Sequence, residues 1–72
     1  MQNYPKVGAK YRHFKGMTVR VLGHSKDSET LVDMVIYLEL TDGQVWVRPV
    51  TMWFDHIERP GVSGPRFTEV EE

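Results

Sequence analysis

Four side chains near the middle of the sequence combine residue types that bind flat or charged ligands. Tyr37 and Glu39 stand two residues apart in one segment, and Trp46 and Arg48 stand two apart in the next. Because side chains alternate between the two faces of a β-strand, each pair shares a face if these segments are strands. Aromatic rings beside a guanidinium stack nucleobases or grip extended peptides, and Trp and Arg are common interface hot spots. The predicted ligand-binding residues are Tyr11, His13, Tyr37, Glu39, Trp46 and Arg48.

A purely structural role for this face stays open. Arg48 can stack on Tyr37 or Trp46, and it can pair with Glu39; each exposed contact of this kind contributes under ~1 kcal/mol. A second part of a small sheet can also cover the face. Binding and structure are therefore both kept as hypotheses.

The spacing of the other polar residues gives little support to metal or acid–base chemistry. The histidines are His13, His24 and His56. None of them stands in a His-x-His or His-x-x-x-His spacing, so we expect no metal site and no cofactor. Segment 24–28 contains serine, histidine and aspartate, but so close together that triad geometry is difficult, and no Gly-x-Ser-x-Gly motif is present. These patterns favour a non-catalytic protein.

Composition and charge narrow the class of protein. The chain has 72 residues, no cysteine and a hydrophobic fraction of 40%, and we expect one small domain over residues 1–72. No run approaches the ~20 apolar residues of a membrane span, and the start lacks the apolar middle of a secretory signal, so we expect a cytoplasmic protein. Residues 1–26 hold six basic and no acidic residues, whereas 27–72 hold ten acidic and three basic. Nucleic acid is a possible partner but not the favoured one, because pairing of basic with acidic strands is the commoner explanation of this asymmetry and the pI is only 6.3.

The elements that must position the candidate face form a predicted hairpin. Segment 31–40 alternates, with apolar residues at every even position, and Asp42-Gly43 is a strong signal for a two-residue turn. Such a turn places Leu40 opposite Val45 and Glu39 opposite Trp46. The predicted core side chains are Leu38, Leu40, Val45 and Val47. The candidate ligand-binding residues then lie on the opposite, outer face.

The remaining segments predict further short strands. We expect strands over 8–14, 18–22, 55–59 and 66–70, and a polar loop over 23–30. Pro49 ends the hairpin, and 50–54 fits one 3-10 turn that places Met52 and an aromatic residue against the core. Residues 1–7 are expected to be loose and 71–72 frayed. About five strands without a long helix indicate an all-β fold, a small antiparallel barrel or a rolled sheet.

Several short motifs resemble a known bacterial family. They are Gly8-x-Lys10-Tyr11-Arg12-His13-Phe14-Lys15-Gly16, Ser28-Glu29-Thr30, Val35-Ile36-Tyr37, Trp46-Val47-Arg48-Pro49-x-x-Met52 and Pro65-Arg66-Phe67. In this order they resemble the family catalogued as domain of unknown function 1653. The resemblance implies a compact β-rich domain of Src-homology-3-like type and supplies no activity. The family's loop has a His-Ser-Glu-Thr run, and here Asp27 stands at the position of that histidine.

Three hypotheses for function follow. The leading one is a non-catalytic binding module for a peptide, a protein partner or single-stranded nucleic acid. The alternative is a small metabolite-binding protein or enzyme that uses a Glu, Arg and His pocket. The third is a structural or oligomer-forming subunit, and we expect a monomer or a homodimer.

Overall fold

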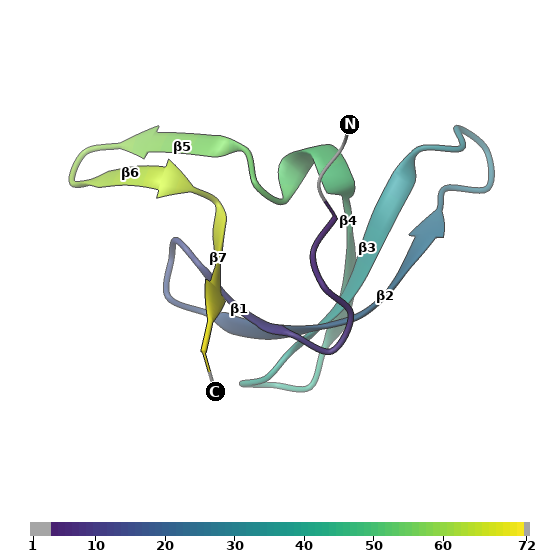
Figure 1. Cartoon of the computed structure of the whole chain (residues 1–72), viewed down its shortest axis with the longest axis horizontal. Helices are drawn as coiled ribbons and strands as arrows, with labels where there is room; N and C mark the ends of the chain where they lie inside the picture. The colour runs from purple at the N-terminus through teal and green to yellow at the C-terminus, as the bar shows by residue number, and fades with distance from the viewer. Residues whose placement is uncertain (1–3, 72) are drawn as a thin grey trace.

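The structure is a computed structural model, and it describes residues 4–71. Its main sheet has five antiparallel strands in the order β4-β3-β2-β1-β7. Their bounds are β1 (Lys10–His13), β2 (Thr18–Lys26), β3 (Asp33–Glu39), β4 (Val45–Pro49) and β7 (Phe67–Val70). A 3-10 turn, η1 (Val50–Met52), leads to a separate hairpin of β5 (His56–Arg59) and β6 (Val62–Pro65). Figure 1 shows the sheet curving into a trough, with η1 and this hairpin above its opening.

The expected all-β fold and 3-10 turn are confirmed, but the expected barrel does not close. Among residues 4–71 no strand pairing joins the two edge strands, β4 and β7, so the domain is an open rolled sheet. Strand β6 was not expected. Pro60-Gly61, which follows the expected strand over 55–59, is the turn of the second hairpin, and Gly61 adopts a φ of 81° there. No helix in the described part of the chain has the length and apolar character needed to cross a membrane.

The central hairpin has a register two residues away from the predicted one. Leu38 pairs with Val45, and Tyr37 pairs with Trp46. The loop spans residues 40–43 and is closed by hydrogen bonds from Gly43 N–H to Glu39 O and from Glu39 N–H to Gln44 O, each 2.9 Å. Of the two expected turn residues only Gly43 has a positive φ, whereas a two-residue type I′ turn needs both. A shift of two keeps every side chain on its predicted face, so the grouping of residues is unchanged.

The prediction of which hairpin face forms the core was wrong. Leu40, Val45 and Val47 are 41, 47 and 58% exposed, and Leu38 is only half-buried. The buried residues are instead Val35 and Tyr37, on the concave face. Alternation identifies the residues that share a face, but the direction in which the sheet curves decides which face is inside.

Aromatic rings from distant segments fill the concave side. Trp53 is fully buried and stacks on Phe67 with ring centroids 3.9 Å apart, while Tyr11 and Tyr37 meet its ring edge-on at 5.5 and 5.1 Å. An aromatic residue after the 3-10 turn was expected in the core, and Trp53 is that residue. Met52, which was expected beside it, is 42% exposed. The core cluster comprises Tyr11, Val19, Val21, Val35, Tyr37, Val50, Trp53 and Phe67.

Two segments predicted to be irregular are more ordered than expected. Strand β2 continues past an irregularity between Val21 and Gly23 to Lys26, so only its end belongs to the polar loop. Part of the segment expected to be loose is attached to the sheet: Pro5 is buried, its carbonyl lies 2.8 Å from His24 Nε2, and the Tyr4 hydroxyl bonds Asp33 at 2.5 Å. Residues 1–3 and 72, part of the same expectation, lie outside the described residues.

Candidate functional site

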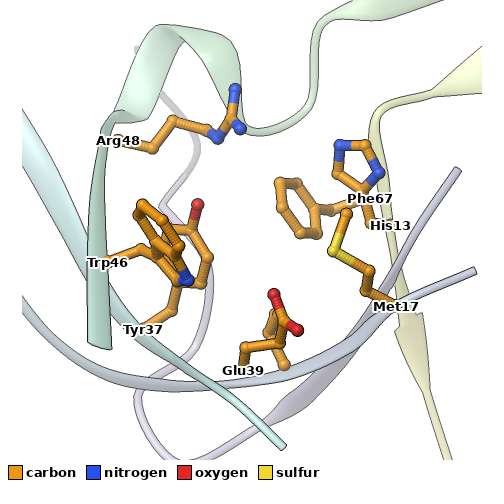
Figure 2. A pocket seen from close by; sticks show the side chains of 8 residues that line it. His13, Met17, Tyr37, Glu39, Trp46, Arg48 and Phe67 are labelled. Carbon is orange, nitrogen blue, oxygen red and sulfur yellow. The ribbon is translucent and has the colours of Figure 1, made fainter. Parts of the chain in front are cut away.

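A cavity of about 220 Å³ lies on the concave side of the sheet (Figure 2). It is lined by His13, Met17, Val19, Tyr37, Glu39, Trp46, Arg48 and Phe67. Five of the six predicted ligand-binding residues are among them. The residues that alternation placed on one face therefore meet around one hollow.

The pairing of β3 with β4 sets the order of these side chains. Tyr37 and Trp46 are direct cross-strand partners, and Arg48 stands opposite Val35. Glu39 lies two residues beyond Tyr37 toward the hairpin loop, and Arg48 lies two residues beyond Trp46 in the other direction. The cavity thus has a carboxylate at one end, a guanidinium at the other and aromatic rings between them, as Figure 2 shows.

The aromatic walls differ in their exposure. Tyr37 and Phe67 are 7 and 2% exposed and belong to the core. Trp46 is 49% exposed, so much of its indole is free to meet another ring. It lies at the rim of a mainly apolar hollow that also contains a few polar groups, the composition that is typical of ligand sites.

Neither charge in the cavity has an ion-pair partner among residues 4–71. The guanidinium of Arg48 lies 5.7 Å from the centre of the Phe67 ring, and its Nε atom is buried without a hydrogen-bond partner. Glu39 and Arg48 form no salt bridge with each other, although both line the hollow. Of the purely structural alternative, the Arg48–Glu39 pair is not observed, and Arg48 lies over the ring of Phe67 and not over Tyr37 or Trp46. A buried donor without a partner costs about 1–3 kcal/mol, and the Trp53 Nε1 atom in the core has the same status.

Comparisons with known proteins identify the family. The sequence model described as "Protein of unknown function (DUF1653)" matches residues 9–69. The chain belongs to the DUF1653 family. Its fold is similar to the crystal structure of a DUF1653 protein from Bordetella bronchiseptica, with a TM-score of 0.79 and 26% identity over 90% of this chain and 87% of that one. No curated protein matches the chain. The family resemblance noted from short motifs is thus confirmed, and it indicates no activity.

His13 is held as a neutral hydrogen-bond donor in the DUF1653 cavity. It is 6% exposed, and its Nδ1 accepts a hydrogen bond from the Lys15 backbone N–H at 3.1 Å. Burial lowers the pKa of His13, and the positive charges of Arg48, Arg66 and Lys15 lower it further against the opposing effect of Asp55. With Nδ1 accepting, the single proton of the neutral ring is on Nε2. This ring can donate to a ligand but has no free lone pair with which to act as a base.

We expect the buried, neutral His13 to make the DUF1653 domain less stable in mild acid. Because its pKa is lowered on folding, the unfolded chain takes up a proton below the ordinary pKa of about 6.5 that the folded chain rejects. The free energy of unfolding is therefore highest above the ordinary pKa. It falls as the pH drops below that pKa, and it stops falling once the pH is below the lowered pKa of the folded chain. Urea unfolding between pH 7.5 and 5 measures this loss. His13→Asn, whose amide oxygen can still accept from Lys15, should flatten the dependence, whereas an unchanged slope would contradict the assignment; exposed His56→Asn is the control.

Tyr11 lies apart from the other predicted ligand-binding residues. It is buried against Trp53, and its hydroxyl accepts a hydrogen bond from the Lys6 backbone N–H at 3.2 Å. It lines a second hollow, of about 250 Å³, with Tyr4, Lys6, Phe54 and Glu69. The structure thus brings five predicted residues together and separates the sixth.

Sequence reasoning missed the cavity residues Met17, Val19 and Phe67. Phe67 pairs with His13 across β7 and β1, so the pairing of the last strand brings it to the site. The sequence of residues 66–70 does not itself indicate that this strand pairs with β1. Val19 and Val21 alternate along β2 and are both buried, so the period of two in this strand is the signal that could have marked Val19 as a residue of the concave face.

Proposed function

We propose that the DUF1653 domain is a non-catalytic binding module whose concave cavity holds one flat, polar, ring-sized group. The observation that carries this proposal is the half-exposed Trp46 between two opposite charges that do not pair with each other. We propose further that the rolled sheet is of Src-homology-3-like type, supported by a long central strand β2 with an irregularity at Val21/Gly23 and by the 3-10 turn after β4.

The size and lining of the cavity support a single ring system. Pockets for drug-sized ligands usually measure about 300–1,000 Å³, so about 220 Å³ suits one ring system, free or carried by a larger partner. Stacking of such a ring on an aromatic side chain is worth about 1–3 kcal/mol. The polar groups at the two ends would then fix its orientation.

Binding is better supported than catalysis at this site. The alternative of an enzyme with a Glu, Arg and His pocket needs a group that accepts a proton near neutral pH. His13 is oriented to donate, because its Nδ1 is already occupied by the Lys15 N–H. A metabolite-binding role that uses the same three residues without turnover remains a form of the present proposal.

We expect Trp46→Ala and Arg48→Ala to abolish binding while changing the melting temperature little. Trp46 is half-exposed, and Arg48 contacts the core only where its guanidinium lies over Phe67, so neither change removes a side chain of the core cluster. A loss of 1 kcal/mol shifts the melting temperature of a domain this size by only about 4–8 °C. Chemical-shift titrations with three flat probes, benzoate, benzamidine and guanosine, measure binding.

The matched control for this experiment is Val45→Ala, on the same strand but on the opposite, convex face. It should bind as the natural chain does. If both cavity variants simply unfold, the face is structural and the proposal fails. It also fails if none of the three probes shifts the Trp46 resonances.

A further inference from the structure

We propose that the flat group is a guanine base, an inference that rests on the binding function proposed above. It comes from the juxtaposition of Arg48, Trp46 and Glu39 around one cavity. One end offers hydrogen-bond donors, the other offers acceptors, and the space between is aromatic. A ligand that contacts all three side chains must be flat, with hydrogen-bond acceptors on one edge and donors on another.

The presence of both charges argues against a simple ion as the ligand. A flat anion would satisfy Arg48 but bring its charge into a hollow that also contains the Glu39 carboxylate. A flat cation would satisfy Glu39 but meet Arg48, whose positive charge already helps to lower the pKa of His13. A neutral ring with polar edges of both kinds avoids either conflict.

The Arg48 end favours two neighbouring acceptors. A guanidinium presents its N–H donors as a planar fork, and the two terminal nitrogens of Arg48, which make no ion pair within residues 4–71, are left to contact a ligand. Guanine carries the acceptors O6 and N7 side by side, and a bidentate arginine on this edge is the commonest specific base contact. Adenine presents a donor beside N7 on the same edge, so it would satisfy only half of the fork.

The Glu39 end favours two neighbouring donors. An ionised carboxylate only accepts hydrogen bonds. Guanine carries N1–H and the exocyclic N2 amine next to each other, and both can donate to one carboxylate. Cytosine offers one amine donor, and uracil and thymine offer no amine. Among the common bases, guanine therefore matches the chemistry of both ends.

The strand geometry leaves room for such a ring. Arg48 stands opposite Val35, and Glu39 lies four residues further along β3, which separates the two levels by about 13 Å at ~3.3 Å per residue. Figure 2 shows the Arg48 side chain extending across one end of the hollow and the Glu39 carboxylate pointing into it from the other end, with Trp46 and Tyr37 along one side and Phe67 on the other. A base entering between them would stack on the exposed Trp46 indole.

The experiment pairs nucleoside analogues with variants of the two ends. Guanosine, 7-deazaguanosine, which lacks the N7 acceptor, inosine, which lacks the N2 amine, and adenosine are titrated into the ¹⁵N-labelled chain. We expect guanosine to bind about tenfold more tightly than each of the others, which corresponds to ~1.4 kcal/mol. In Arg48→Gln the difference between guanosine and 7-deazaguanosine should vanish. In Glu39→Gln the difference between guanosine and inosine should vanish, and the melting temperature of each variant shows that it is folded.

The outcomes separate this inference from the proposed function. Equal affinities for guanosine and adenosine, or analogue differences that persist in both variants, would overturn the guanine assignment. Shifts at Trp46 caused by benzoate or benzamidine would then still uphold the binding cavity. If no flat probe shifts Trp46, both the assignment and the binding module are rejected.

A final comparison identifies the source of the base. Guanosine monophosphate and a nine-nucleotide thymidine strand with one central guanine carry the same base with different surroundings. Tighter binding of the strand, weakening steeply with salt, assigns single-stranded nucleic acid as the source. Equal or weaker binding of the strand assigns a free nucleotide. If neither compound binds more tightly than its adenine counterpart, the inference is overturned.

Discussion

Trp53→Ala should leave the chain without a cooperative folded state. Trp53 is fully buried, its ring stacks on Phe67, and the rings of Tyr11 and Tyr37 meet it edge-on. Truncation of a buried Trp typically costs about 3–5 kcal/mol. At ~0.05–0.15 kcal/mol per residue, a 72-residue chain has only about 4–11 kcal/mol of stability to lose. Thermal unfolding followed by near-UV circular dichroism should show no sharp transition.

The neighbouring Phe54→Ala is the matched control for this change. Phe54 is 38% exposed and follows Trp53 directly, so its truncation leaves the centre of the ring cluster in place. We expect it to lower stability by about 1 kcal/mol, typical of changes outside the core. A sharp transition within a few degrees of the natural chain in Trp53→Ala would show that the cluster is not the centre of the fold.

Asp55→Ala should be the second most damaging change, because it breaks the tie at the base of the β5–β6 hairpin. Both carboxylate oxygens of Asp55 accept from Arg66, at 2.9 Å from Nε and 3.0 Å from Nη2, and the backbone N–H of Arg66 donates to the Asp55 carbonyl at 2.9 Å. Hydrogen bonds to charged groups are worth about 1.5–3 kcal/mol, and solvent reduces this because the Asp55 side chain is 32% exposed. Urea unfolding at pH 7 should show a loss of about 1–2 kcal/mol.

The same ion pair makes a separate prediction about acid. The Arg66 hydrogen bonds hold the pKa of Asp55 below its ordinary value. Its contribution is therefore fully present above the unfolded pKa of about 3.9 and is lost as pH falls through the lowered folded pKa. Asp55→Ala should lose less stability than the natural chain between pH 5 and 2. The control is Glu58→Gln, at an exposed carboxylate that lies 3.6 Å from His56 and accepts a long hydrogen bond of 3.5 Å from Ser63, and an equal effect there would contradict the special role of Asp55.

The candidate site could be predicted from sequence to the extent that it depends on alternation. Tyr37, Glu39, Trp46 and Arg48 share a face because a strand has a period of two, and a register error of two residues did not disturb this. The period does not identify the buried face. Aliphatic residues fill one side of the hairpin, yet the concave side closes around Tyr37, because Trp53 and Phe67 arrive there from later segments.

Features that depend on distant pairing could not be predicted in the same way. The four-residue loop at 40–43 and a two-residue turn contain the same Asp42-Gly43 signal, so the local sequence does not distinguish their registers. Phe67 reaches the cavity only because β7 pairs with β1. The asymmetry of charge was interpreted correctly in part: Lys6 pairs with Glu69, and Lys26 pairs with Asp33. These pairs join basic residues of the first part of the chain to acidic residues of the later part.

The ring cluster around Trp53 also bears on how fast the domain can fold. Its members Tyr11, Tyr37, Trp53 and Phe67 come from four segments spread over most of the chain. The β3–β4 hairpin can form early from neighbouring residues, but it buries little on its own. Closing the long loops lowers the entropy of the chain, and this unfavourable step comes before the four rings meet and stabilise one another. For its length, the DUF1653 domain should therefore fold at the slow end of the range, over milliseconds to seconds, as other sheets built from distant contacts do.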